Sequence, residues 1–160
     1  MTDEAGLRDL SLGYASAVDA LDGPGFADLF AEDGELWVPD VSVGPDPTIC
    51  RSGARALARI PSGLARYHRT SHRVGPAVYV VDGESATGHV SGVAHHLSVS
   101  TVAAPDGRGP PVGGPGTDHV WYLRYEDRYR REPTGWRIAR RDLHLRWIED
   151  RPVDHVGPGR

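Results

Sequence analysis

The chain has 160 residues, a length that favours one domain with a core large enough to enclose a pocket. Its formal net charge is −4 and it shows no basic face, which argues against nucleic acid as a partner. No apolar run approaches the roughly 18 residues of a membrane span, and the acidic start is unlike a secretory signal, so we expect a cytoplasmic protein with no membrane contact. Cys50 is the single cysteine, which excludes an intramolecular disulfide and a cysteine-based zinc site.

Helical periodicity dominates the first third of the chain. Residues 2–23 carry apolar side chains at steps of three and four, which predicts an amphipathic helix. Its apolar stripe consists of Leu7, Leu10, Tyr14, Val18 and Leu21. Shorter helices are predicted over 25–33 and 52–63, with a first strand over 34–40 between them.

The periodicity changes to two near residue 70. The predicted strands span 70–83, 84–102, 119–131 and 135–147. The Gly/Pro-rich segment 103–117 predicts a long mobile loop near an end of the sheet. In the last strand, the apolar positions move from even to odd numbers, which predicts a β-bulge around Arg140–Asp142.

Helices followed by antiparallel strands indicate an α+β fold. We expect a strongly curved sheet that forms a cone around the N-terminal helices and leaves an open mouth. Residues 1–150 would form the single domain, and residues 151–160 a C-terminal tail.

Four segments of the chain resemble the SnoaL-like branch of the nuclear transport factor 2-like superfamily. They are YASAVDALD at 14–22, ADLFAEDGELWV at 27–38, RTSHRVG at 69–75 and YEDRYRREPTGWRIARR at 125–141. The resemblance covers about residues 5–148. It implies the cone-shaped fold, which serves dehydratases, isomerases, cyclases, hydrolases and non-catalytic binders alike.

A narrower resemblance, to the dehydrochlorinase and dehydratase members of that superfamily, implies site residues. Those enzymes use a His–Asp dyad. Its Asp lies near the end of the first helix, and its His opens the strand that follows the third helix. Asp19 and His72 match these two positions. Hexachlorocyclohexane dehydrochlorinase has an Arg in a Trp-x-x-x-x-Arg phrase, which matches Arg141 rather than its neighbour Arg140. Bile acid 7-alpha-dehydratase has a Tyr five residues before its Asp, which matches Tyr14. The helix-borne Lys of the dehydrochlorinase has no counterpart here.

The chemistry of these residue types suits proton abstraction. Histidine titrates near neutral pH and serves as a general base, and a carboxylate on its second ring nitrogen fixes the tautomer and stabilises the imidazolium. An Arg or a Tyr hydroxyl can stabilise the developing oxyanion. Each residue also has a structural alternative: His72 as a solvated strand residue, Asp19 as a helix-end acid, and Tyr14 as part of the core.

The remaining histidines do not form a convincing metal site, because His95 and His96 point to opposite faces of a strand. No cofactor is expected. Apolar side chains that can line the cone are Trp37, Val78, Val80, Trp121 and Leu123. A second copy of the chain could pair with the outer face of the sheet around Tyr122, so we expect a homodimer or homotrimer.

The resemblance and these residues predict a cofactor-independent lyase of the dehydratase type. Its substrate would be a mid-sized, mostly apolar small molecule, such as a polyketide or terpenoid intermediate. The same base could serve an isomerase or an aldol cyclase. A non-catalytic small-molecule binder and an accessory subunit of a larger oxygenase are the alternatives from other classes.

Overall fold

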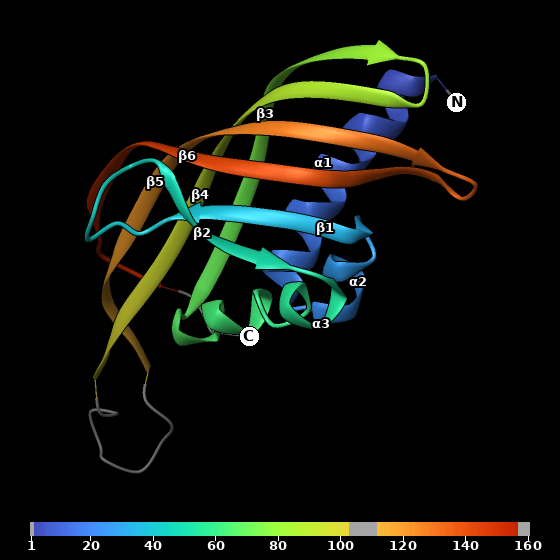
Figure 1. Ribbon diagram of the computed structural model, residues 1–160. Coiled ribbons are helices and arrows are strands. Elements are labelled where there is room, and N and C mark those ends of the chain that lie inside the picture. Colours follow the sequence, from blue (N-terminus) through green and yellow to red (C-terminus); the bar gives the residue numbers. More distant parts are fainter. Residues whose placement is uncertain (1, 103–111, 157–160) are drawn as a thin grey trace.

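The computed structural model describes residues 2–102 and 112–156. In chain order its elements are α1 (Asp3–Ala20), α2 (Gly23–Ala27), β1 (Phe30–Pro39), β2 (Pro47–Ser52), α3 (Ala54–Leu57), a 3₁₀ helix (Pro61–Arg66), β3 (Arg69–Asp82), β4 (Ser85–Val102), β5 (Val112–Glu132) and β6 (Gly135–Val153). The strands form one six-stranded sheet in the order β2-β1-β6-β5-β4-β3. The pairs are antiparallel except for β1 and β6, which run parallel. Figure 1 shows the curved, unclosed sheet bent around α1, so the α+β prediction is confirmed.

The first helix is placed by its apolar stripe. The Thr2 hydroxyl caps its start by accepting a hydrogen bond from the Ala5 backbone N–H at 3.3 Å. Leu7, Tyr14 and Val18 are buried against the inner face of the sheet, as their spacing predicts. The helix ends at Leu21, whose φ of 56° lies in the left-handed region that a C-terminal cap often adopts.

Several element boundaries differ from the sequence expectation. Residues 30–33 belong to β1 rather than to a helix, because Phe30 is buried and pairs with Ile138 of β6. The edge strand β2 was not expected, since its short PTICRS sequence begins with Pro and shows little alternation. Strand β6 continues to Val153, past the boundary at residue 150.

The predicted loop at 103–117 is shorter than expected. Strand β5 already begins at Val112, which pairs with Val102, and Gly116 pairs with both Val99 and Val153. The part of the prediction that concerns residues 103–111 lies outside the described residues.

A β-bulge in β3 changes which side chains face inward. Val74 pairs with Gly92 but Ala77 pairs with Val90, so β3 carries one extra residue here. The bulge reverses the alternation, and Val78 is 66% exposed. Val80 is 64% exposed, so the expectation that Val78 and Val80 line the cone is wrong.

A second bulge, in β6, decides which of two arginines is buried. Arg128 pairs with Arg140 but Tyr129 pairs with Ile138, which leaves Ala139 as the extra residue, next to the predicted position. Beyond it, Arg141 points inward with 1% of its side chain exposed. Arg140 points outward and lies over the ring of Trp37, at 4.7 Å from its centroid. Trp37 is thus on the outer face and does not line the cone, contrary to the sequence expectation.

The buried Arg141 joins α1 to the sheet. Its Nε and Nη2 donate to the two carboxylate oxygens of Asp127 at 2.8 and 2.7 Å, and Nη2 also donates to the Ser11 hydroxyl at 3.0 Å. Asp127 accepts a further hydrogen bond from the Tyr129 hydroxyl at 2.5 Å. The guanidinium carbon lies 4.4 Å from the Tyr14 ring centroid. Because both charges are buried, each depends on the other for compensation.

We expect Arg141→Ala to lower the free energy of unfolding by about 3–5 kcal/mol, because it leaves the Asp127 carboxylate buried and unpaired. Arg140→Ala is the matched control, since the neighbouring arginine is partly exposed and should contribute about 1 kcal/mol or less. Urea denaturation of the two variants measures the difference. Equal losses would contradict the assignment of Arg141 as the buried partner.

Candidate active site

A pocket of about 220 Å³ opens between α1, the 3₁₀ helix and the inner face of the sheet. Its wall is mostly apolar and includes Val18, Leu36, Val38, Ile60, Leu64, Ala94, Trp121, Leu123 and Leu143. Its polar side chains are Tyr14, Arg66, Tyr67, His72, His96 and Tyr125. A mostly apolar wall with a few converging polar groups is typical of a small-molecule site.

Two elements bring Asp19 and His72 together at this pocket. Asp19 lies in the last turn of α1, and His72 is near the start of β3, which packs alongside that helix. The Nδ1 atom of His72 lies 2.7 Å from Oδ1 of Asp19. The backbone N–H of His72 donates to Oδ2 at 2.7 Å, and the Thr70 hydroxyl donates to Oδ1 at 2.9 Å. The sequence-predicted pair is therefore in direct contact, and three donors hold the carboxylate.

These contacts keep Asp19 ionised. Burial by itself would raise the pKa of this carboxyl, but the hydrogen bonds from the His72 ring, the His72 backbone and Thr70, with the charge of His72, together lower the pKa below its usual range. An ionised carboxylate can only accept hydrogen bonds, so Nδ1 of His72 carries the proton. The lone pair on Nε2 is then the basic position of the ring.

A second histidine, His96, lines the same pocket. Its ring centroid is 5.5 Å from that of His72, with the two planes at 87°. Nδ1 of His96 lies 3.2 Å from the backbone carbonyl of His119, which can only accept, so Nε2 again carries the lone pair. Burial, followed by the nearby charge of His72, lowers the pKa of His96 to about 4, so this ring is neutral at neutral pH.

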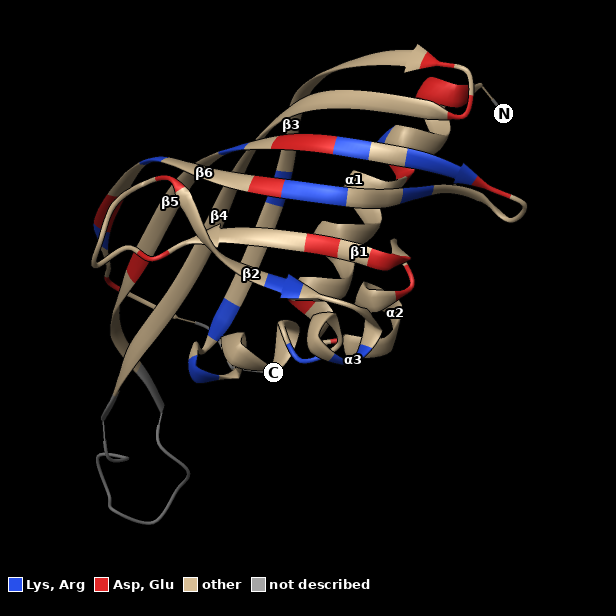
Figure 2. Cartoon of the chain, in the orientation of Figure 1, with Lys and Arg blue, Asp and Glu red and all other residues tan. Residues whose placement is uncertain are grey.

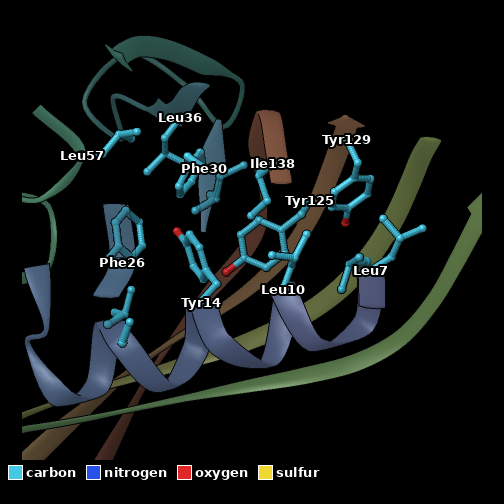
Figure 3. Packing of buried hydrophobic residues seen from close by; sticks show 14 of the residues in the cluster. Leu7, Leu10, Tyr14, Phe26, Phe30, Leu36, Leu57, Tyr125, Tyr129 and Ile138 are labelled. Atoms are coloured by element: carbon cyan, nitrogen blue, oxygen red, sulfur yellow. The ribbon is translucent and has the colours of Figure 1, made fainter. Parts of the chain in front are cut away.

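Two buried tyrosine hydroxyls are among the hydrogen-bond donors of the pocket. Tyr14 projects from α1 between Phe26 and Tyr125, as Figure 3 shows, with ring centroids 4.9 and 5.6 Å away. Burial raises the pKa of Tyr14 to about 12, although the charge of Arg141 acts in the opposite direction. The pKa of Tyr125 is also raised by burial. Both hydroxyls are therefore protonated at neutral pH.

The structure brings some of the sequence-predicted residues together and leaves others apart. Trp121 and Leu123 line the pocket with His72 and Tyr14, as expected. Trp37 and Val78 are on the outer face, so neither contributes to the wall. Arg141 is behind the wall, under the rings of Tyr14 and Tyr125, with its donors engaged by Asp127 and Ser11 rather than directed into the pocket.

Sequence reasoning missed His96 as a pocket residue. Its inward position could be predicted, because His96 is two residues from Ala94 on the strand face that carries the core residues. The sequence pattern led us to consider His96 only as a metal ligand beside His95. The hydrogen-bond partner of His96 is the backbone carbonyl of His119 on β5, which no pattern of side chains predicts.

The described residues contain no group of three or more His, Cys, Asp or Glu side chains placed to hold a metal ion. No helix of the described chain is long and apolar enough to cross a membrane.

Comparisons with solved structures return proteins of the same fold. A protein of unknown function from Mycobacterium tuberculosis is 25% identical, with 88% of this chain and 70% of that one covered and a TM-score of 0.65. A candidate scytalone dehydratase from Novosphingobium aromaticivorans is 20% identical over 97% of this chain and 91% of that one, with a TM-score of 0.69. A hexachlorocyclohexane dehydrochlorinase from Novosphingobium barchaimii is 14% identical over 97% and 94%, with a TM-score of 0.71.

Comparison with curated proteins gives no match. Residues 1–142, however, match the SnoaL-like domain, and this match spans both dyad residues and five of the six strands in full. On this match, and on the fold that it shares with the structures above, the chain belongs to the SnoaL-like domain family.

Proposed function

We propose that this protein is a cofactor-independent lyase of the dehydratase type, with His72 as its general base. The observation that carries the proposal is the 2.7 Å contact between His72 Nδ1 and Asp19 Oδ1 at the wall of an apolar pocket. Such a pair gives a base of fixed tautomer at a mostly apolar wall. The dehydratase and dehydrochlorinase named among the structural neighbours are consistent with elimination chemistry.

The proposed reaction starts with proton transfer to Nε2 of His72 from a carbon next to a carbonyl. The resulting imidazolium is stabilised by the ionised Asp19. His96 is neutral and presents a lone pair rather than a proton, so it cannot act as the acid for a leaving group. His72 therefore returns the proton to the leaving hydroxyl oxygen, the C–O bond breaks, and water departs.

Tyr14 is the proposed donor to the substrate oxygen on which negative charge develops. Its hydroxyl is protonated at neutral pH and its ring forms part of the wall. Arg141 contributes indirectly: its cation lies under the Tyr14 ring and favours negative charge at that end of the pocket. Arg141 is thus proposed as a positioning residue instead of the substrate contact that the sequence suggested.

The volume of the pocket limits the size of the substrate more narrowly than the sequence analysis did. A cavity of about 150 Å³ accommodates benzene, and this pocket measures about 220 Å³. We therefore propose a substrate whose reacting part is about one substituted ring, with any extension at the mouth. Because His72 and His96 both present lone pairs, the substrate should carry a hydroxyl or N–H donor near its acidic C–H bond.

The same residues would also support an isomerase, in which His72 returns the proton to a different carbon. The two outcomes separate in one experiment. Small cyclic hydroxyketones are incubated with the protein in D₂O and followed by mass spectrometry. Loss of water identifies the lyase, and uptake of deuterium at constant composition identifies the isomerase. A non-catalytic binder would give neither.

We expect His72→Ala to lower kcat on the order of 10²–10⁴-fold, because it removes the general base. Asp19→Asn should cause a large but smaller loss, since the ring keeps a hydrogen-bond partner and loses the charge that stabilises the imidazolium. Steady-state kinetics on the substrate found in the D₂O screen measures both.

His89→Ala is the matched control for this series, because His89 lies on β4 outside the pocket and should leave kcat unchanged. Circular dichroism of each variant checks the fold. If His72→Ala keeps most of the activity while remaining folded, the dyad is not the catalytic centre.

The neutral state of His96 predicts an acid-labile fold. Its pKa falls from 6.5 to about 4 on folding, so between these pH values the unfolded chain binds the proton and the folded chain does not. Stability should therefore fall as pH decreases from 6.5 to 4, by about 3 kcal/mol from this residue at the lower end. Asp19 contributes in a separate window below pH 3.8, because its pKa is lowered.

Urea denaturation of the wild type and of His96→Phe, at intervals across this range, isolates the contribution of His96. The wild-type curve should decline more steeply, and the variant should lack that part of the slope. Parallel curves would show that His96 takes up its proton in the folded state.

We infer that the protein forms a homodimer or homotrimer through the outer face of the sheet. Tyr122 and Trp147 stack there with ring centroids 4.2 Å apart, and Trp147 is 52% exposed. Figure 2 shows basic and acidic residues interspersed on β5 and β6, which hold Tyr122 and Trp147, so these two strands carry no charge of one sign that would repel a second copy. Light scattering after gel filtration should give two or three copies, and Trp147→Glu should shift the protein toward monomer. A monomeric wild type would contradict the inference.

A further inference from the structure

We propose that Ser98, His119 and Asp150 form a second, serine-based acyl-transfer site, separate from the pocket of His72. The three residues come from three neighbouring strands, β4, β5 and β6. The Ser98 hydroxyl lies 3.0 Å from Nε2 of His119, and Nδ1 of the same ring lies 2.7 Å from Oδ1 of Asp150. A nucleophile, a base and an orienting carboxylate in this order are the parts of a serine hydrolase triad.

The register of the strands fixes this arrangement. His119 pairs with His96 on one side and with Asp150 on the other, while Ser98 is two residues along β4 from His96. Residues two apart on a strand share a face. The three side chains therefore meet on one face of a rigid part of the sheet, instead of being carried by separate loops.

The hydrogen bonds also determine where the protons are. Asp150 is 63% exposed, and its carboxylate can only accept a hydrogen bond, so Nδ1 of His119 donates to it. Nε2 is then unprotonated, and Ser98 donates to it. The backbone carbonyl of Thr117 is the competing acceptor for the Ser98 proton, at a longer 3.3 Å. This tautomer is the one in which histidine can withdraw the serine proton.

A cleft beside Ser98 can admit an acyl group. It has a volume of about 320 Å³ and is lined by Ser98, Val99, Ser100, Pro115, Gly116 and Thr117. None of these side chains is large or charged, and the lining is mostly polar, so the cleft suits a small neutral acyl group such as acetyl. His119 does not line the pocket of His72. The centroid of its ring lies 6.4 Å from the ring centroid of Tyr67, which does line that pocket. The two sites thus share a boundary and differ in their reactive groups.

The proposed substrate class is a short-chain carboxylic ester. Ser98 Oγ bonds to the carbonyl carbon while its proton passes to His119 Nε2. The ester C–O bond then breaks, and the same proton goes to the departing alcohol. Water next attacks the acyl-serine, gives a proton through His119 to Ser98 Oγ, and releases the carboxylic acid. The balance is one ester and one water consumed, and one alcohol and one acid formed.

The His95–Asp118 pair provides an internal comparison. Its Nδ1-to-carboxylate distance is 2.8 Å, close to that of His119 and Asp150. Among the described residues, however, no serine or threonine hydroxyl hydrogen-bonds to His95. If a surface His–Asp pair were sufficient for ester hydrolysis, the two pairs would behave alike.

The first test uses a fluorophosphonate probe, which phosphonylates an activated serine with loss of fluoride, and p-nitrophenyl acetate as the ester. We expect peptide mass spectrometry to locate the adduct on Ser98, and Ser98→Ala and His119→Ala each to lower ester hydrolysis by at least about 10-fold. His95→Ala should retain it, because His95 lines neither the cleft nor the pocket of His72. Labelling spread over several serines, or hydrolysis that survives Ser98→Ala, would overturn the proposal.

A second test separates activation of residue 98 from turnover. In Ser98→Cys, the new thiol should react with iodoacetamide at least about 10-fold faster at pH 7 than the thiol of Ser100→Cys, because an imidazole acceptor stabilises the thiolate. Replacing His119 by Ala in the Ser98→Cys protein should remove the difference. Equal alkylation rates in the two cysteine variants would show that His119 does not act as a base toward residue 98.

Discussion

The ion pair between Arg141 and Asp127 is the interaction on which the arrangement of this protein depends. Both side chains are almost completely buried, and neither charge could remain there alone. Their hydrogen bonds reach Ser11 on α1 and Tyr129 on β5, and the guanidinium lies under the rings of Tyr14 and Tyr125. The pair thereby fixes the helix against the sheet and places two tyrosines of the pocket wall. Burying the pair costs desolvation energy that apolar residues of similar volume would avoid, so its value is in specifying one packing of α1 on the sheet.

The polar groups of the pocket have a consistent division of roles that follows from their partners outside it. His72 and His96 each use Nδ1 toward a fixed acceptor, the Asp19 carboxylate in one case and the His119 carbonyl in the other. In both rings, therefore, Nε2 carries the lone pair and is the basic atom. The tyrosine hydroxyls remain protonated because burial disfavours their anions. The acceptors His72 and His96 are on β3 and β4, and the donors Tyr14 and Tyr125 are on α1 and β5. In the proposed reaction they hold the two ends of one substrate, as elimination next to a carbonyl requires.

Much of this arrangement could be predicted from the sequence, and the predictions that were wrong have physical causes. The apolar stripe of α1 and the alternation on β5 are local patterns, so they predicted the burial of Leu7 and the inward position of Leu123. Asp19 and His72 could be paired only through the family resemblance, because nothing local relates two residues that far apart. Val78 was misplaced because a single extra residue in β3 reverses every later position, and alternation alone cannot reveal where it is inserted. His96 was missed because its partner is a backbone carbonyl, which carries no sequence signal.

The position of Asp19 shows how function and stability are combined at one point of the fold. The last turn of a helix has a partial negative charge, so a carboxylate there is unfavourable by itself. Three hydrogen-bond donors, two of them from His72 and one from Thr70, reverse this preference and lower the pKa of the carboxyl. The backbone N–H of His72 holds the carboxylate to the start of β3, and the Nδ1–H of its ring donates to the same carboxylate in both protonation states of the ring. In the proposed reaction, the dyad exchanges a proton with the substrate while the junction between α1 and β3 stays closed.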